Sequence, residues 1–188
     1  MDAKRQYLQD LGYDLEGVYS RNRDLRMRGI YGTSRHCISM ENAGRLWACI
    51  TPITDVVNSG VPIDADDYGK LTVSAALAVE DELAALNVFG GFGIGQKIAN
   101  LYMKDQWALG RVVPLELVLH APLDRLVLRT LRKELGWPRR WSAWTKVRAR
   151  PNPAVIDEYL EMQDTIRVMA GSKTPLEYEQ GIWHEASA

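Results

Sequence analysis

The sequence predicts an all-α chain, on three observations. Apolar residues recur at the three- and four-residue spacing of amphipathic helices through most of the chain, whereas alternating strand patterns are short and few. Ser, Thr, Asp or Asn precedes many of these segments, as expected of helix N-caps. With 46% hydrophobic residues, the 188 residues are enough for a single domain over 1–188, with two helical lobes sharing a cleft.

The first half of the chain contains three predicted helical segments. The first covers Ala3 to Leu11, and the second runs from about Glu41 to Ile50, ending before Pro52. From Asp66 to Leu86, acidic residues near the start and apolar residues at helical spacing predict one long helix or a broken pair. The last segment is expected to form the first arm of a helical hairpin over about 77–110.

A glycine-rich stretch joins the two arms of this hairpin. Gly93 and Gly95 permit a tight turn, and the backbone amides there would point outward at a helix N-terminus. The helix dipole favours an anion such as a DNA phosphate at that position. We therefore predict DNA contacts at Gly93, Ile94, Gly95 and Gln96; an ordinary glycine-rich connection between two helices is the alternative.

Lys97 and Asp124 are the candidate catalytic residues. Lys97 is expected in the first turn of the second hairpin helix, where the positive end of the dipole disfavours the ammonium form and favours a nucleophilic amine. Asp124 follows Pro122 and precedes an apolar-periodic run, which predicts the N-cap of a helix over about 122–136. Across a cleft from the hairpin, this carboxylate would stabilise a cation or accept a proton. Helix capping alone is the structural alternative.

Two further residues are candidates for the wall of a pocket. His120 lies four residues before Asp124 and would line the pocket or contact a phosphate. Trp107 offers an aromatic surface on which a base would stack. The alternatives are a hydrogen-bonded, partly buried loop histidine and an aromatic ring packed in the core.

Two helices are predicted over 152–186. Asn152 and Pro153 open the first helix, and Gly171 closes it. The segment from Thr174 to Glu177 has the spacing of a capping box and begins the second. Both helices are expected to cover the core rather than to contribute chemistry.

Composition excludes several classes of protein. The two cysteines, Cys37 and Cys49, are too few for a disulfide scaffold, and the three histidines are scattered, so we expect neither a metal site nor a cofactor. No apolar run approaches the roughly 20 residues that cross a bilayer, and the first residues lack an apolar signal segment. We therefore expect a cytoplasmic protein with no membrane partner.

The charge balance does not by itself indicate a nucleic-acid-binding protein. The chain has 23 basic and 24 acidic side chains, but the basic residues gather in 21–28 and in 125–150. Either segment is a solvated face or a DNA-contacting surface. Motifs, rather than net charge, therefore indicate DNA contact.

Taken together, the hairpin and the aspartate segment resemble the helix-hairpin-helix plus Gly/Pro-Asp superfamily of DNA glycosylases. Residues 93–97, Ala99 and Asn100 match its Gly-hydrophobe-Gly-x-Lys turn, and Pro122 with Asp124 matches its x-Pro-x-Asp segment. The similarity covers roughly a quarter of the chain. It implies a glycosylase-like helical bundle with a cleft between two lobes, which binds a base extruded from DNA. In the family the lysine forms a Schiff base with deoxyribose, and the aspartate is essential.

Three departures favour one offshoot of this superfamily. The interval from Lys97 to Asp124 is longer than in the common repair enzymes, no cysteine quartet follows Asp124, and no glutamine-containing wedge segment is found. Certain bacteriophages hypermodify thymine, and glycosylase-like proteins there join an amine or amino acid to an activated 5-methyl group. In that interpretation Asp124 orients or deprotonates the amine, and Lys97 neutralises the departing phosphate.

Three functions follow, in order of preference. The first is a transferase, in the host cytoplasm, that joins an amino acid or polyamine to a 5-phosphomethyl deoxyuridine in DNA. The second is a bifunctional DNA N-glycosylase and AP lyase of base-excision repair, and the third is a noncatalytic DNA-binding relative. The transferase would leave intact DNA with a heavier base, whereas the glycosylase would leave an abasic or nicked strand. Replacement of Lys97 or Asp124 would leave the noncatalytic relative unchanged.

Overall fold

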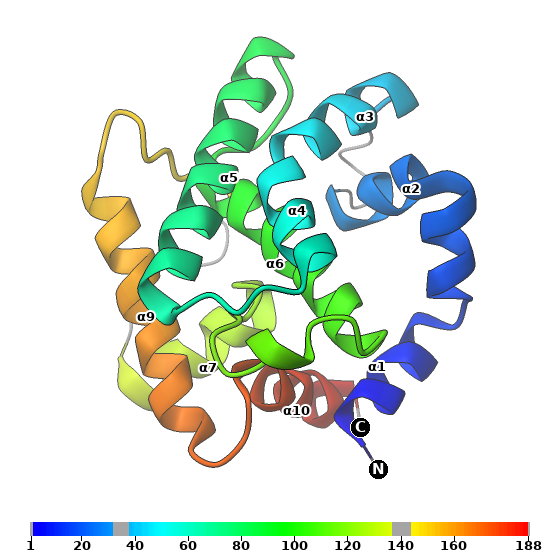
Figure 1. The fold of residues 1–188 in the computed structure, drawn as a ribbon. Helices are drawn as coiled ribbons and strands as arrows, with labels where there is room; N and C mark the ends of the chain where they lie inside the picture. Colours follow the sequence, from blue (N-terminus) through cyan, green and yellow to red (C-terminus); the bar gives the residue numbers. More distant parts are fainter. Residues whose placement is uncertain (1, 32–37, 137–143, 188) are drawn as a thin grey trace.

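The computed structural model describes residues 2–31, 38–136 and 144–187, and within these ranges the chain forms helices and no strand (Figure 1). The prediction of an all-α chain is confirmed. Cys37, Arg139 and Arg140, which contributed to the cysteine and charge predictions, lie outside the described residues. The helices are α1 (Ala3–Leu11), α2 (Leu15–Tyr31), α3 (Met40–Cys49), α4 (Thr51–Ser59), α5 (Ala65–Ala85), α6 (Phe92–Ala108), the 3-10 helix η1 (Val113–Leu115), α7 (Arg125–Leu135), α9 (Ala154–Ala170) and α10 (Pro175–Ser187).

Local capping signals account for most helix starts. Asp2 accepts a hydrogen bond from the amide of Lys4 at the start of α1, and Ser39 accepts one from Asn42 at the start of α3. The helix predicted from Ala3 to Leu11 has those bounds in the structure, and the segment after Asp64 is one continuous helix. The sequence did not predict α2 and α4, which are also helical.

The capping box predicted before α10 is present. The amide of Glu177 donates to Thr174 Oγ1 (3.2 Å), and the amide of Thr174 donates to Glu177 Oε2 (2.7 Å). Gly171 closes α9 with a φ of 60°. The capping box and Gly171 are both local signals, which explains why the end of α9 and the start of α10 could be predicted from the sequence.

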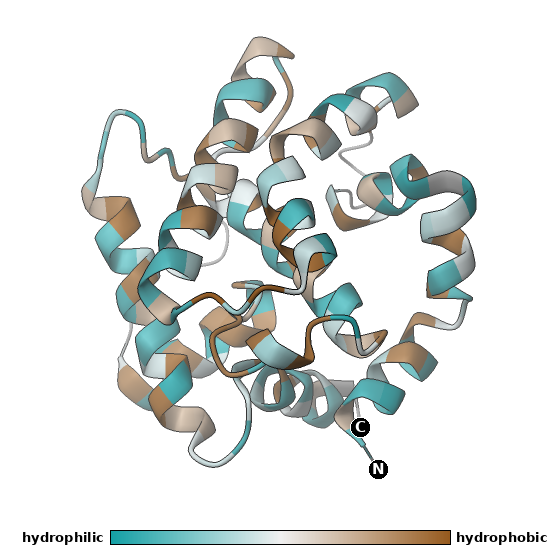
Figure 2. Ribbon diagram, in the orientation of Figure 1, coloured by the Kyte–Doolittle hydropathy of each residue, from teal (hydrophilic) through white to brown (hydrophobic). Residues whose placement is uncertain are grey.

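The buried side chains form two clusters that meet at α5 and α6. The first cluster takes residues mainly from α1 to α6 and from the segment before His120. The second takes residues from α7 and α9, with Ala76 from α5 and Phe92 from α6. Hydrophobic and hydrophilic residues alternate around helices such as α5 and α9, as expected where one side of a helix is buried (Figure 2).

The loop of the α5–α6 hairpin begins with a Schellman motif. Asn87 takes the left-handed conformation (φ 52°), its amide donates to Ala84 O (3.1 Å), and the amide of Val88 donates to Leu83 O (3.0 Å). Gly90 follows with a φ of 137°. The chain then enters α6 at Phe92, so the turn lies before the predicted glycines.

Gly93 and Gly95 lie inside α6 rather than in the turn that precedes it. A Cβ on Gly95 would lie 2.3 Å from Ala76 O of α5, and a Cβ on Gly93 would lie 2.0 Å from Trp144 O. The two glycines therefore allow α5 and the Trp144 segment to approach α6 closely. This packing, rather than a positive φ, is the physical reason for glycine at both positions.

Candidate active site

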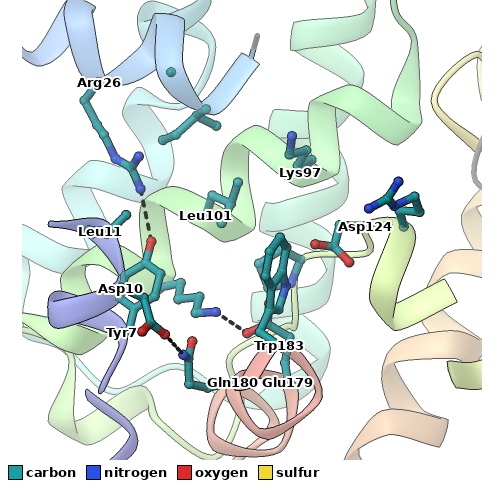
Figure 3. A pocket seen from close by; sticks show the side chains of 15 residues that line it. Tyr7, Asp10, Leu11, Arg26, Lys97, Leu101, Asp124, Glu179, Gln180 and Trp183 are labelled. Atoms are coloured by element: carbon teal, nitrogen blue, oxygen red, sulfur yellow. Dashed lines mark hydrogen bonds and ion pairs between the residues drawn. The ribbon is translucent and has the colours of Figure 1, made fainter. Parts of the chain in front are cut away.

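One cavity of about 540 Å³ is lined by both predicted catalytic residues, Lys97 and Asp124 (Figure 3). Its wall is formed by α1, α2, α6, the start of α7 and α10. The volume lies within the range of small-molecule sites. The structure thus brings together two side chains that are 27 positions apart in the sequence.

Lys97 reaches the cavity from the second turn of α6, not the first, because the helix begins at Phe92. It shares one face of α6 with Leu101 and Lys104, which follow at positions four and seven and also line the cavity. No hydrogen bond or ion pair joins the side chain of Lys97 to any other described residue. Burial lowers the pKa of the Lys97 amine, although Asp124 opposes this shift. The side chain is therefore a candidate nucleophile or proton carrier.

Asp124 is the N-cap of α7 as well as a cavity residue. Its Oδ1 accepts hydrogen bonds from the amides of Leu126 (2.8 Å) and Val127 (3.0 Å). Burial raises the pKa of the Asp124 carboxyl, while the two capping bonds, and then Lys104 and Lys97, lower it. The capping prediction is confirmed, and the same carboxyl is more basic than an ordinary aspartate.

Gln96 fixes the segment that leads into Asp124. Its Nε2 donates to Leu123 O (3.0 Å) and to Gly93 O (2.8 Å), and its Oε1 accepts from the amide of Leu123 (3.1 Å). Gln163 makes the same pair of bonds, both 2.9 Å, with the backbone of Ala121. Two buried amides therefore hold the 121–123 segment against α6 and α9.

Residues 93–96, where the sequence predicts DNA contacts, are not exposed in the structure. Gly93, Ile94, Gly95 and Gln96 are all buried in the first turns of α6. The Gln96 amide is occupied by backbone groups of the protein, and the glycines pack against neighbouring backbone. In the structure these four residues pack α6 against its neighbours and position the segment before Asp124, and they present no exposed surface to a phosphate.

His120 and Trp107, the other pocket candidates, do not line the Lys97 cavity. His120 is 2% exposed, its Nδ1 lies 2.7 Å from Tyr159 Oη, and it lines a separate cavity of about 300 Å³. Burial lowers the pKa of His120 to about 3. Trp107 is fully buried in the first core cluster, where Lys4 Nζ lies 5.6 Å from its ring centroid. His120 is thus a buried, hydrogen-bonded histidine and Trp107 a core aromatic residue, which are the structural alternatives given for them above.

A buried network that the sequence did not reveal borders the cavity. Arg26 donates two hydrogen bonds to Asp105, of 2.7 and 2.6 Å. Tyr7 and Tyr19 donate to the same carboxylate at 2.6 and 2.5 Å. Through these bonds α1, α2 and α6 are joined beside the site. The basic segment 21–28 was the only sequence signal, and its charges were interpreted as a solvated face or a DNA-contacting surface rather than as part of a buried network.

The C-terminal helix α10 contributes three side chains to the cavity, contrary to the expectation that it only covers the core. Glu179 forms a buried ion pair with Lys104, whose Nζ lies 4.5 Å from the Tyr7 ring centroid. Gln180 and the partly exposed Trp183 complete this wall. The seven-residue spacing from Lys97 to Lys104 was the available signal, since it places both amines on one helix face.

Burial favours the neutral form of both candidate catalytic groups. It lowers the pKa of the Lys97 amine and raises the pKa of the Asp124 carboxyl. The neighbouring cations Arg26 and Lys104 are each paired with a carboxylate. An amine and a carboxyl in one cavity, with pKa values shifted toward each other, are suited to nucleophilic attack and proton transfer.

Within the described residues, no three His, Cys, Asp or Glu side chains are arranged to hold a metal ion. None of the described helices combines the length and the apolar character needed to cross a membrane. Comparisons with protein families, curated proteins and solved structures find no match to this chain.

Proposed function

We propose that this chain is an enzyme that takes a base extruded from DNA into the Lys97 cavity and joins an amine to it. The observation that supports this best is the shared cavity of Lys97 and Asp124. The arrangement agrees with the resemblance described above, because Lys97 lies on the second arm of the α5–α6 hairpin and Asp124 begins the following long helix. The cavity, bounded by helices of both core clusters, then corresponds to the cleft between two lobes of a glycosylase-like bundle.

The proposed substrate is a deoxyuridine that carries a 5-phosphomethyl group. The nitrogen of a neutral amine attacks the methylene carbon, and a C–N bond forms as the C–O bond to phosphate breaks. The phosphate departs with the electron pair, and the surplus proton on nitrogen passes to Asp124. A raised pKa makes Asp124 a better proton acceptor than an ordinary carboxylate. In its ammonium form Lys97 pairs with the departing phosphate.

DNA is the expected macromolecular partner. Extrusion of a base costs a few kcal/mol, which contacts to the flanking backbone must offset. Arg125 is exposed and lines the cavity beside Asp124, so it is placed to pair with a phosphate of the flipped nucleotide. This contact replaces the predicted grip by the glycines of α6.

A glycosylase with lyase activity is the second candidate, and one observation favours it. Lys97 has a lowered pKa and no hydrogen-bond or ion-pair partner among the described residues, as a Schiff-base nucleophile requires. In this mechanism the amine attacks C1′ of the deoxyribose and the base departs. Asp124 then stabilises the positive charge that develops on the sugar.

Mass spectrometry of the reaction products separates these functions. The purified chain is incubated with duplexes that contain thymine, 5-hydroxymethyluracil, its phosphorylated form or oxidised bases, with amino acids and polyamines supplied. The transferase predicts a mass gain on an intact strand that contains the 5-phosphomethyl base, abolished by Asp124→Asn. Asp157→Asn, which removes an exposed carboxylate of α9 outside the cavity, is the matched control.

The other outcomes are equally specific. Release of free base, with borohydride trapping that Lys97→Met abolishes, would establish the glycosylase and overturn the transferase. DNA binding without any product, unchanged by Lys97→Met and Asp124→Asn, would establish a noncatalytic relative.

A further inference from the structure

The end of the cavity between α1 and α10 is rich in hydrogen-bond acceptors. Asp10 lines it, and its two oxygens accept from Gln6 Nε2 (2.7 Å) and Gln180 Nε2 (2.9 Å). Both donors are neutral amides, and no cation lies within ion-pair distance of Asp10 among the described residues. Since each carboxylate oxygen can accept more than one hydrogen bond, Asp10 is held in place without being neutralised.

Gln180 adds a second acceptor that lacks a donor. The side chain is 3% exposed and lines the cavity, and its Oε1 is buried with no hydrogen-bond partner among the described residues. The amide cannot be turned over, because its Nε2 donates to Asp10. A buried carbonyl left unsatisfied costs about 1–3 kcal/mol, so it calls for a donor from outside the chain.

The neighbouring cations do not supply that donor. Lys104 is paired with Glu179, and Arg26 with Asp105. Figure 3 shows Asp10 and Gln180 close together at one end of the cavity, away from Lys97 and Asp124. The site therefore has a reactive end and a separate end where both neighbouring cations are paired and the Asp10 carboxylate is not.

We propose that Asp10 and Gln180 bind an ammonium group, which makes the co-substrate a diamine or polyamine. This inference rests on the proposed transferase. One ammonium binds at Asp10 and Gln180, while the other nitrogen, as a neutral amine, reaches the base beside Asp124. Trp183, 39% exposed in the same wall, offers an aromatic face to the alkyl chain and its charge. An amino acid would instead bring its own carboxylate into a site that already contains Asp10.

Calorimetric titration with 1,4-diaminobutane tests the ammonium site without DNA. We expect binding to the wild-type chain, weakened roughly 10- to 100-fold by Asp10→Asn, as for loss of a hydrogen bond to a charged group. Gln180→Met should weaken binding less, because it removes a neutral acceptor. Asp157→Asn, the exposed α9 control, should bind like the wild type. Equal affinity of the wild-type chain and Asp10→Asn would overturn the inference.

Steady-state transfer to 5-phosphomethyl DNA extends the test. Asp10→Asn should raise KM for the diamine by about tenfold or more and leave kcat nearly unchanged, because the ammonium contact is the same in ground and transition states. Transfer of an amino acid, independent of Asp10, would overturn the inference and keep the proposed function. Diamine binding that depends on Asp10, without any transfer, would overturn the proposed function and keep the ammonium site.

Discussion

Gln96 and Leu123 exchange two hydrogen bonds, of 3.0 and 3.1 Å, between the side-chain amide of Gln96 and the backbone C=O and N–H of Leu123. Each has a candidate catalytic residue as its next neighbour in the chain, Lys97 after Gln96 and Asp124 after Leu123. The pair therefore joins the helix that contains the amine to the segment that contains the carboxyl. A fixed separation between two reacting groups is a main source of catalytic rate.

Replacement of Gln96 by leucine should lower both stability and activity. The backbone N–H and C=O of Leu123 would lose these partners while buried, which costs roughly 1–3 kcal/mol of unfolding free energy, measured by urea denaturation. Gln163→Leu is the matched control, because Gln163 makes the same two bonds to Ala121, farther along the chain from Asp124. We expect a similar loss of stability but a smaller loss of product formation. Equal activity of the Gln96 and Gln163 variants would contradict the positioning role of Gln96.

Gly95→Ala tests whether glycine serves helix packing at this position. The new Cβ would lie 2.3 Å from Ala76 O, so the backbone of α5 or α6 must shift, at a cost of about 1–3 kcal/mol. Gly181→Ala in α10 is the control, because its Cβ would meet no atom within 4 Å. The higher helix propensity of alanine should there raise the unfolding free energy by about 0.5–1 kcal/mol. Thermal unfolding should show a lower midpoint temperature for Gly95→Ala and a higher one for Gly181→Ala than for the wild type. A stable Gly95→Ala would mean that α5 and α6 need not approach so closely.

The helices that could be predicted from the sequence are those whose ends are marked by nearby capping residues. The cap before α1 and the capping box before α10 are formed by residues within three positions of each other. The helix α2 was not predicted, because its arginines masked the apolar face made by Met27 and Ile30. Burial of Arg26 depends on Asp105, 79 positions away, and no local pattern contains that information.

The candidate site was predictable only in part, for the same physical reason. Lys97 and Asp124 were identified by motif, and the structure places both in one cavity. The tight turn predicted at the glycines was wrong, because a close approach to Ala76 and a tight turn both favour glycine in the sequence. The contribution of α10 depends on the pairing of Lys104 with Glu179, which only the tertiary fold creates.

Asp124→Asn should abolish the proposed transfer activity without destabilising the chain. Asparagine caps a helix about as well as aspartate, so the bonds to Leu126 and Val127 can be kept. Burial raises the pKa of the Asp124 carboxyl, which means that its contribution to stability is largest at low pH and is lost as pH rises through the folded-state pKa. At neutral pH the variant should therefore equal or exceed the wild type in unfolding free energy, and this gain should vanish on acidification. A large loss of stability at neutral pH would show that Asp124 serves mainly as a cap.

The pH dependence of amine acetylation should distinguish Lys97 from a surface lysine. Only a neutral amine reacts with acetic anhydride, so the labelling rate at each lysine, followed by peptide mass spectrometry, rises through the pKa of that lysine. Burial lowers the pKa of Lys97, whereas the hydrogen bond to Asp67 raises the pKa of Lys70 in the same chain. Lys97 should thus reach its full rate at a lower pH than Lys70, which serves as the internal control.

Asp124→Asn sharpens the labelling test, because the Asp124 carboxylate raises the pKa of Lys97 and its removal should shift the Lys97 profile to still lower pH. The Lys70 profile should stay in place, since its pKa depends on Asp67. A Lys97 profile at or above that of Lys70 would contradict an amine prepared for nucleophilic attack. Lys97 would then act only as a fixed positive charge, which is compatible with phosphate binding by the transferase and not with a Schiff base.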